Sequence, residues 1–104
     1  MTVRRYEIIF SGPENQRLTL EALAERAGFH PAVVQSFNDC GLIEPSAREG
    51  GRLFFNKDTV PRLHMIRRLR DNLGINLAGI SVILDLRDRL IALQRENATY
   101  RSRL

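Results

Sequence analysis

Apolar residues recur along the first half of the chain at the spacing of two short helices. In the segment LTLEALAERAG, one helical face carries Leu20, Leu23, Ala24 and Ala27. Thr19 is positioned to cap the start of this helix, and Gly28 suits the left-handed residue after its end. A second helix is expected to begin at Pro31, whose missing N–H has no intrahelical partner there anyway, and to end at Gly41. Two short helices joined by a glycine-containing turn predict a helix-turn-helix.

A hairpin and a third helix are expected next. The apolar runs LIEP and RLFF flank SAREGG, whose two glycines favour a tight turn, so we predict a β-hairpin wing. Asp58 is the expected cap of the third helix, because Pro61 is tolerated only in a first helical turn. The apolar positions of this helix, which Gly74 closes, are Val60, Leu63, Ile66, Leu69 and Leu73.

The last helix is expected to begin near Asn76 or Leu77 and to run towards the C-terminus. Its apolar positions alternate between spacings of three and four residues, which is the a/d pattern of a coiled coil. They are Ile83, Leu86, Leu90, Leu93, Asn97, Tyr100 and Leu104. At Asn97, an a position, a buried amide fixes register and partner number. We therefore predict a homodimer through this helix; the alternative is an amphipathic helix packed on its own domain.

Length and composition bound the class of protein. For 104 residues, 43% of them hydrophobic, we expect a mainly α fold: a winged helix-turn-helix over residues 1–75 and a dimerisation helix over 76–104. The N-terminal RRYEIIF, followed by the turn formers SGPEN, predicts an additional short strand. No apolar run is long enough to span a membrane, and a single cysteine, Cys40, fits a reducing compartment, so a cytoplasmic location is expected.

The net charge of +4 is unevenly distributed. Residues 18–41 hold one basic residue against three acidic ones, whereas residues 57–70 hold five basic residues against Asp58 alone. The helix expected over residues 31–40 contains no Lys or Arg. Recognition of bases relies on Arg, Lys, Asn and Gln, and affinity relies on neutralised phosphates, so this composition weakens DNA binding without excluding it.

The order of these elements resembles the MerR superfamily, in which a helix-turn-helix precedes a wing of the form G-L-I-x-P, G-x-R-x-aromatic and D. The residues that match are Gly41, Leu42, Ile43, Pro45, Gly50, Arg52, Phe54 and Asp58. Within the superfamily, LGINLAGISVILDLRDRLIAL is similar to CbpM-like chaperone modulators and to HspR-like repressors, and the N-terminal RRYEIIF favours the first. DNA-binding members usually carry T-L-R-x-Y in the second helix, where this chain has AVVQSFN. The resemblance also implies an antiparallel dimer.

The first functional hypothesis is a non-enzymatic CbpM-like modulator. The resemblance implies that it binds the J-domain of a DnaJ/CbpA-type co-chaperone and blocks engagement of DnaK. Acidic and apolar side chains of the first two helices are expected to contact the basic helix of the J-domain. The expected contacts are Glu21, Glu25, Val34, Gln35, Asn38 and Asp39.

The alternative hypothesis is a MerR/HspR-like transcriptional regulator that binds duplex DNA as a dimer. The expected DNA contacts are Gln35, Ser36, Asn38, Arg48, Arg52, Arg67 and Arg68. A dimeric adaptor for another protein is a third possibility. No cofactor or small-molecule ligand is inferred. Cys40 has no evident base partner, so no catalysis is predicted. Metal sensors of the superfamily carry cysteines at the start of the dimer helix, where this chain has none.

Overall fold

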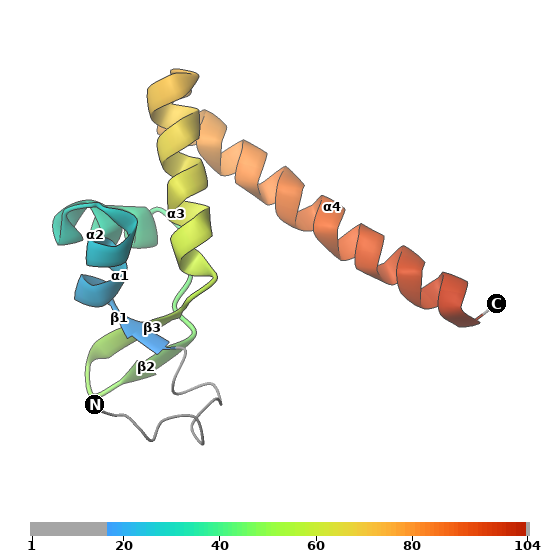
Figure 1. Cartoon of the computed structure of the whole chain (residues 1–104), viewed down its shortest axis with the longest axis horizontal. Helices are drawn as coiled ribbons and strands as arrows, with labels where there is room; N and C mark the ends of the chain where they lie inside the picture. Colours follow the sequence, from blue (N-terminus) through green and yellow to red (C-terminus); the bar gives the residue numbers. More distant parts are fainter. Residues whose placement is uncertain (1–16, 104) are drawn as a thin grey trace. The chain divides into compact units, whose positions relative to one another are not determined.

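The computed structural model describes residues 17–103. Contacts divide the chain into two compact units, residues 1–65 and residues 66–104. The described part is mainly helical, as predicted, and its elements can be followed in Figure 1. In chain order they are β1 (Arg17–Thr19), α1 (Leu20–Ala27), α2 (Pro31–Asp39), β2 (Ala47–Glu49), β3 (Arg52–Asn56), α3 (Thr59–Arg67), the π-helix η3 (Arg68–Asn72) and α4 (Leu77–Arg103).

The two short helices begin and end with the predicted signals. The Thr19 hydroxyl accepts a hydrogen bond from the backbone N–H of Ala22 at 3.1 Å, and Gly28 adopts a left-handed φ of 77° after the end of α1. His30 caps α2, because its Nδ1 accepts the backbone N–H of Ala32 at 3.0 Å. Pro31 then occupies the first helical turn, as expected.

The helix-turn-helix is held together by an apolar core. α1 and α2 pack against each other, and the ring of Phe29 meets that of Phe37 edge-on at 5.5 Å between centroids. The buried apolar side chains of residues 17–65 are Leu18, Leu23, Ala24, Ala27, Val34, Phe37, Leu42, Ile43, Phe55 and Leu63.

The wing is a hairpin within a three-stranded antiparallel sheet of order β1-β3-β2. Gly50 and Gly51 form its turn with φ values of 58° and 77°, the combination that a type I′ turn requires. The prediction that LIEP forms the first strand of the hairpin was wrong. Leu42 and Ile43 are core residues in the turn after α2, and the strand begins only at Ala47.

The third strand, β1, was not predicted. Residues 17–19 carry only one apolar side chain, Leu18, which pairs in register with the buried Phe55 of β3. Three residues are too short for an alternating pattern to be recognised. The strand predicted for RRYEIIF lies outside the described residues.

The third helix starts where predicted but does not continue regularly. α3 begins directly after Asp58, with Pro61 in its first turn. At Arg68 the helix widens into η3, in which the N–H of Leu73 donates to the Arg68 carbonyl, five residues back, at 3.3 Å. The expected place of Leu73 on the apolar face was therefore wrong, because the wider turn rotates this side chain outward to 68% exposure.

The last helix, α4, follows a cap at Asn76, the predicted start. Asn76 Oδ1 accepts the backbone N–H of Gly79 at 2.8 Å. In the second unit, α4 contacts η3, and its buried side chains are Ile80 and Leu84. Within residues 17–103, no helix has the length and apolarity needed to cross a membrane.

Candidate nucleic-acid interface

An open depression in the first unit brings several predicted site residues together. It lies among the start of α1, the exposed face of α2 and the wing. The lining residues are Thr19, Leu20, Glu21, Gln35, Arg48, Gly51, Arg52 and Leu53. Arg48 and Arg52, which were assigned to DNA contact, thus meet Glu21, which was assigned to a protein partner, and Gln35, which was assigned to both.

The two wing arginines lie on opposite faces of the hairpin, and both line the depression. Arg48 pairs in register with Leu53, and Arg52 pairs with Glu49. Because side chains alternate along a strand, Arg48 and Leu53 share the face of the buried Phe55, whereas Arg52 shares the face of Phe54. Both guanidinium groups are exposed and have no ion-pair partner among residues 17–103. They are therefore available to an anionic ligand.

The exposed face of α2 is polar and carries no positive charge. Gln35 Nε2 donates to Asp39 Oδ1 at 2.9 Å, one helical turn away. The hydroxyl of Ser36 donates back to the Val33 carbonyl at 2.7 Å, and Asn38 is half-buried. Ser36 is therefore a weaker candidate for contact with a ligand than Gln35.

Val34 does not belong to the site. Its side chain is 0% exposed within the core, so its assignment to partner contact was wrong. One stripe of α2 must face the core, and Val34 lies with Phe37 on that stripe. Glu21 and Glu25 are exposed one turn apart on α1, but only Glu21 lines the depression.

The two other predicted arginines are not among the lining residues. Arg67, at the end of α3, is half-buried, and Arg68, at the start of η3, is exposed. Both belong to the second unit. The DNA contacts predicted from sequence therefore divide between the two units of the chain.

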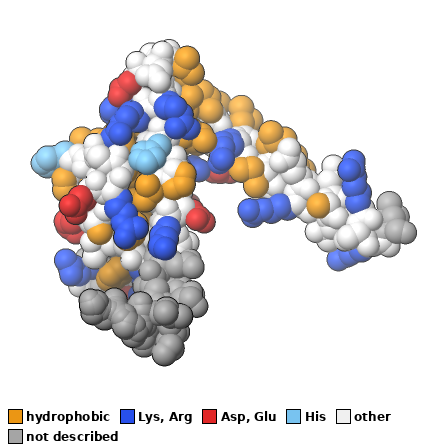
Figure 2. Space-filling view, in the orientation of Figure 1, with side chains coloured by type: hydrophobic (Ala, Val, Ile, Leu, Met, Phe, Trp, Pro, Cys, Tyr) orange, Lys and Arg blue, Asp and Glu red, His pale blue; other side chains and the backbone are white. Residues whose placement is uncertain are grey.

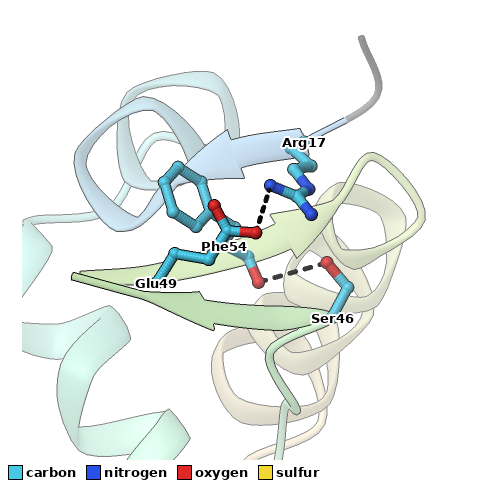
Figure 3. A network of polar contacts seen from close by, with 4 residues as sticks. All are labelled: Arg17, Ser46, Glu49 and Phe54. Carbon is cyan, nitrogen blue, oxygen red and sulfur yellow. Dashed lines mark hydrogen bonds and ion pairs between the residues drawn. The ribbon is translucent and has the colours of Figure 1, made fainter. Parts of the chain in front are cut away.

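Two further arginines, missed in the sequence, support the wing. Arg17 of β1 forms an ion pair with Glu49 of β2 at 3.0 Å and lies over the Phe54 ring, 5.4 Å from its centroid (Figure 3). Arg62 of α3 donates from Nε to the Leu42 carbonyl at 2.6 Å, which fastens the turn between α2 and the wing. Neither contact has a local sequence signal, since the partners are distant in the chain.

A separate apolar face runs along α4. Its predicted positions Leu86, Leu90, Leu93 and Tyr100 are 55% to 61% exposed, and orange side chains mark the surface of α4 in Figure 2. Asn97 is exposed among them, whereas Ile83 is half-buried. Val82, at 59% exposure and four residues before Leu86, extends this face and was missed. Leu104 lies outside the described residues.

Other chemistry is sparse in the described part of the chain. Among residues 17–103 there is no group of three or more His, Cys, Asp and Glu side chains that could hold a metal ion. Cys40 is a free, exposed thiol at the end of α2.

The two helices, their tight turn and the hairpin define a winged helix-turn-helix protein. The chain belongs to the MerR helix-turn-helix family of regulatory proteins, whose family model matches residues 18–102. This finding agrees with the resemblance in the wing motif.

Relatives in this family include proteins of several regulatory systems. The chain is 31% identical over 80 residues to the heat shock protein HspR of Streptomyces coelicolor, covering 76% of this chain and 52% of that protein. It is 35% identical over 68 residues to the mercuric resistance operon regulatory protein of Bacillus cereus, covering 64% and 51% respectively. It is 31% identical over 86 residues to the nodulation protein NolA of Bradyrhizobium elkanii, covering 82% and 39%.

The chain thus spans about half the length, or less, of the curated relatives it matches. These relatives favour the transcriptional-regulator hypothesis over the chaperone-modulator hypothesis.

Proposed function

We propose that this protein is a non-enzymatic regulator that binds duplex DNA through the wing and the exposed face of α2. The observation that carries the proposal is the depression at which Arg48 and Arg52 meet Gln35. Guanidinium groups contact phosphates, which supply most of the affinity, and a glutamine amide recognises base edges. Membership of the MerR family supports this combination.

In this proposal, the wing arginines supply the positive charge at the depression. α2 contributes no positive charge, and Glu21 adds a negative charge at the same depression. Arg48 and Arg52 must therefore offset this repulsion as well as neutralise phosphates. We expect weak binding by a single chain, with a steep dependence on salt.

Dimerisation is part of the same proposal. A second copy of the chain would cover the apolar face of α4. More than half of the surface of these side chains is exposed, and removing apolar surface from water lowers the free energy. Two linked wings would engage DNA together and raise the affinity without a new contact. In this proposal, residues 1–75 bind DNA and residues 76–104 form the dimer.

A second candidate function is the binding of a J-domain. The observation that favours it is the lack of Lys or Arg on α2, together with the exposed carboxylates of Glu21, Glu25 and Asp39. A basic helix of a co-chaperone is complementary to such a surface. In that case the wing would have no nucleic-acid ligand, and the protein would compete with DnaK for the J-domain.

A paired titration separates the two functions. The purified chain is titrated with mixed genomic duplex fragments at about 50 mM salt, which favours phosphate contacts, and separately with a J-domain from the same organism. We expect DNA binding that weakens with salt. The double variant Arg48→Ala/Arg52→Ala should lower the salt slope by about two, because each lost phosphate contact removes about one.

Arg26→Ala is the matched control. It removes the same charge as either wing substitution does alone, from an exposed position of α1 that does not line the depression, so the salt slope should stay unchanged. Tight J-domain binding with no shift of any duplex would reject the first proposal in favour of the second. An equal loss per removed charge in the control and in the wing variant would show that only net charge matters.

A further inference from the structure

The further inference rests on the proposed function and concerns the base edges that α2 selects. Gln35 and Asp39 are exposed one helical turn apart on α2. Glu21 of α1 lines the same depression as Gln35. These three side chains form what we call the acceptor face.

The hydrogen bond within α2 fixes the orientation of the glutamine amide. Gln35 Nε2 donates to Asp39 Oδ1 at 2.9 Å. A carboxylate only accepts hydrogen bonds, so the amide must turn its NH₂ end towards Asp39. Its carbonyl oxygen, Oε1, is the end turned away, and it has no other partner among residues 17–103.

Few hydrogen-bond donors compete with these acceptors on this helix, and one N–H of Gln35 Nε2 is already given to Asp39. Ser36 donates its hydroxyl proton to the Val33 carbonyl at 2.7 Å. Asn38, the other amide of α2, is half-buried and does not line the depression. No Lys or Arg lies on α2. A ligand therefore meets mainly hydrogen-bond acceptors on this face and guanidinium donors on the wing.

The geometry points to α2 as a selector of the base on the strand next to Gln35: it favours a base whose exocyclic amino group, N6 of adenine or N4 of cytosine, lies in the major groove on that strand. Adenine and cytosine donate from these groups, and glutamine or carboxylate oxygens accept. Guanine presents only acceptors, O6 and N7, which would face the oxygens of Gln35 and Asp39. Arg48 and Arg52, which are exposed and unpaired in the described part, would contact phosphates beside the selected base.

The test is selection from a randomised duplex library, followed by Kd measurements on duplexes that differ at one position. We expect the wild-type chain to prefer adenine or cytosine over guanine by roughly tenfold at the selected position of the strand next to Gln35. Gln35→Arg should shift this preference to guanine, since arginine donates to O6 and N7 together. Position 35 is exposed, so the substitution leaves the core unchanged.

Two companion variants make the outcome specific. Asp39→Asn replaces an obligatory acceptor by an amide and frees the orientation of Gln35, so discrimination against guanine should fall severalfold while overall affinity rises with the lost negative charge. The Ser36 hydroxyl donates to a backbone carbonyl, so Ser36→Ala should leave base preference unchanged.

Three results would contradict the inference. They are a wild-type preference for guanine, DNA binding without any base preference, and an unchanged preference in Gln35→Arg. These would leave the proposed DNA-binding function standing. Failure of the wild-type chain to bind any duplex at low salt would instead remove the proposed function itself, and the inference with it.

Discussion

The guanidinium of Arg17 reaches across β3 to Glu49, with 3.0 Å between its nitrogen and the carboxylate oxygen. Arg17 lies on β1 and Glu49 on β2, the two outer strands of the sheet. Phe54 belongs to the central strand, β3, and the centroid of its ring is 5.4 Å from the guanidinium carbon (Figure 3). One side chain thus connects all three strands and holds the wing to the strand that leads into α1.

Loss of this connection should destabilise the domain modestly. Arg17 is 25% exposed and Glu49 60% exposed, so water screens the ion pair, and its share is at most about 1 kcal/mol. The contact with Phe54 adds about 0.5–1 kcal/mol. We expect Arg17→Ala to lower the unfolding free energy by about 1–2 kcal/mol in urea titrations and Glu49→Ala by less than about 1 kcal/mol. Equal losses from the two variants would show that the ring contact contributes nothing.

Val34 and Gln35 are neighbours with opposite roles, which a pair of variants can separate. Val34 is 0% exposed, so Val34→Ala should lower the unfolding free energy by about 2 kcal/mol through lost burial and a residual cavity. The affinity of the folded Val34→Ala variant for DNA or a J-domain should equal that of the wild-type chain. Gln35→Ala should leave urea unfolding nearly unchanged. If the fully folded Val34→Ala variant bound its partner more weakly, Val34 would belong to the interface.

The turn of the wing depends on backbone conformation alone. A Cβ atom at Gly50 or at Gly51 would meet nothing within 4 Å, so sterics with other residues do not enter. The positive φ values of the two glycines decide the cost, because alanine avoids the left-handed region. Gly51→Ala should cost about 1–2 kcal/mol, whereas Gly50→Asn should be tolerated, since Asn-Gly is favoured in type I′ turns. Thermal unfolding followed by circular dichroism measures both, and an equal cost for the two would contradict a type I′ turn.

Gly79 should resist the substitution that usually stabilises a helix. Alanine is favoured over glycine in helices by about 1 kcal/mol. However, a Cβ at Gly79 would lie 2.7 Å from Cγ2 of Ile75 and 3.4 Å from Oδ1 of Asn76, the cap of α4. Ile75 is β-branched, so its χ1 rotamers are restricted and its side chain cannot easily move aside. We therefore expect Gly79→Ala to lower the melting temperature rather than raise it.

The neighbouring Ala78 supplies the control. It is exposed, so Ala78→Gly measures helix propensity alone and should cost about 1 kcal/mol. Asn76→Ala should cost a similar amount through loss of the cap. A higher melting temperature for Gly79→Ala would show that the start of α4 relaxes without loss of its cap.

Much of the fold was predictable because its signals are local. Thr19, Gly28 and Pro31 act within one helical turn of their own positions, and the structure has each in its predicted role. The start of α4 at Leu77 follows equally from its cap. The errors arose where longer-range packing decides. LIEP is apolar because Leu42 and Ile43 fill the core, not because it forms a strand, and η3 rotates Leu73 out of an otherwise regular stripe.

The candidate site was predicted only in part, for the same reason. Gln35, Arg48 and Arg52 could be proposed from residue type and from position on a helix or hairpin. Their meeting at one depression depends on the packing of α1 and α2 beside the wing, which no local pattern contains. The supporting contacts of Arg17 and Arg62 join residues more than 15 positions apart in the chain, so they required the structure.

The apolar face of α4 gives a sharp test of dimerisation. Leu90 and Leu93 are 55% and 60% exposed in a single chain, so acidic residues at these positions do not disturb its core. In a dimer they would be buried without partners, which is strongly unfavourable. We therefore expect Leu90→Asp/Leu93→Asp to remain helical by circular dichroism but to halve the mass measured by light scattering. Leu84→Asp, at a buried position of the same helix, should instead lose its fold. A dimeric mass retained by the double variant would show that α4 does not form the interface.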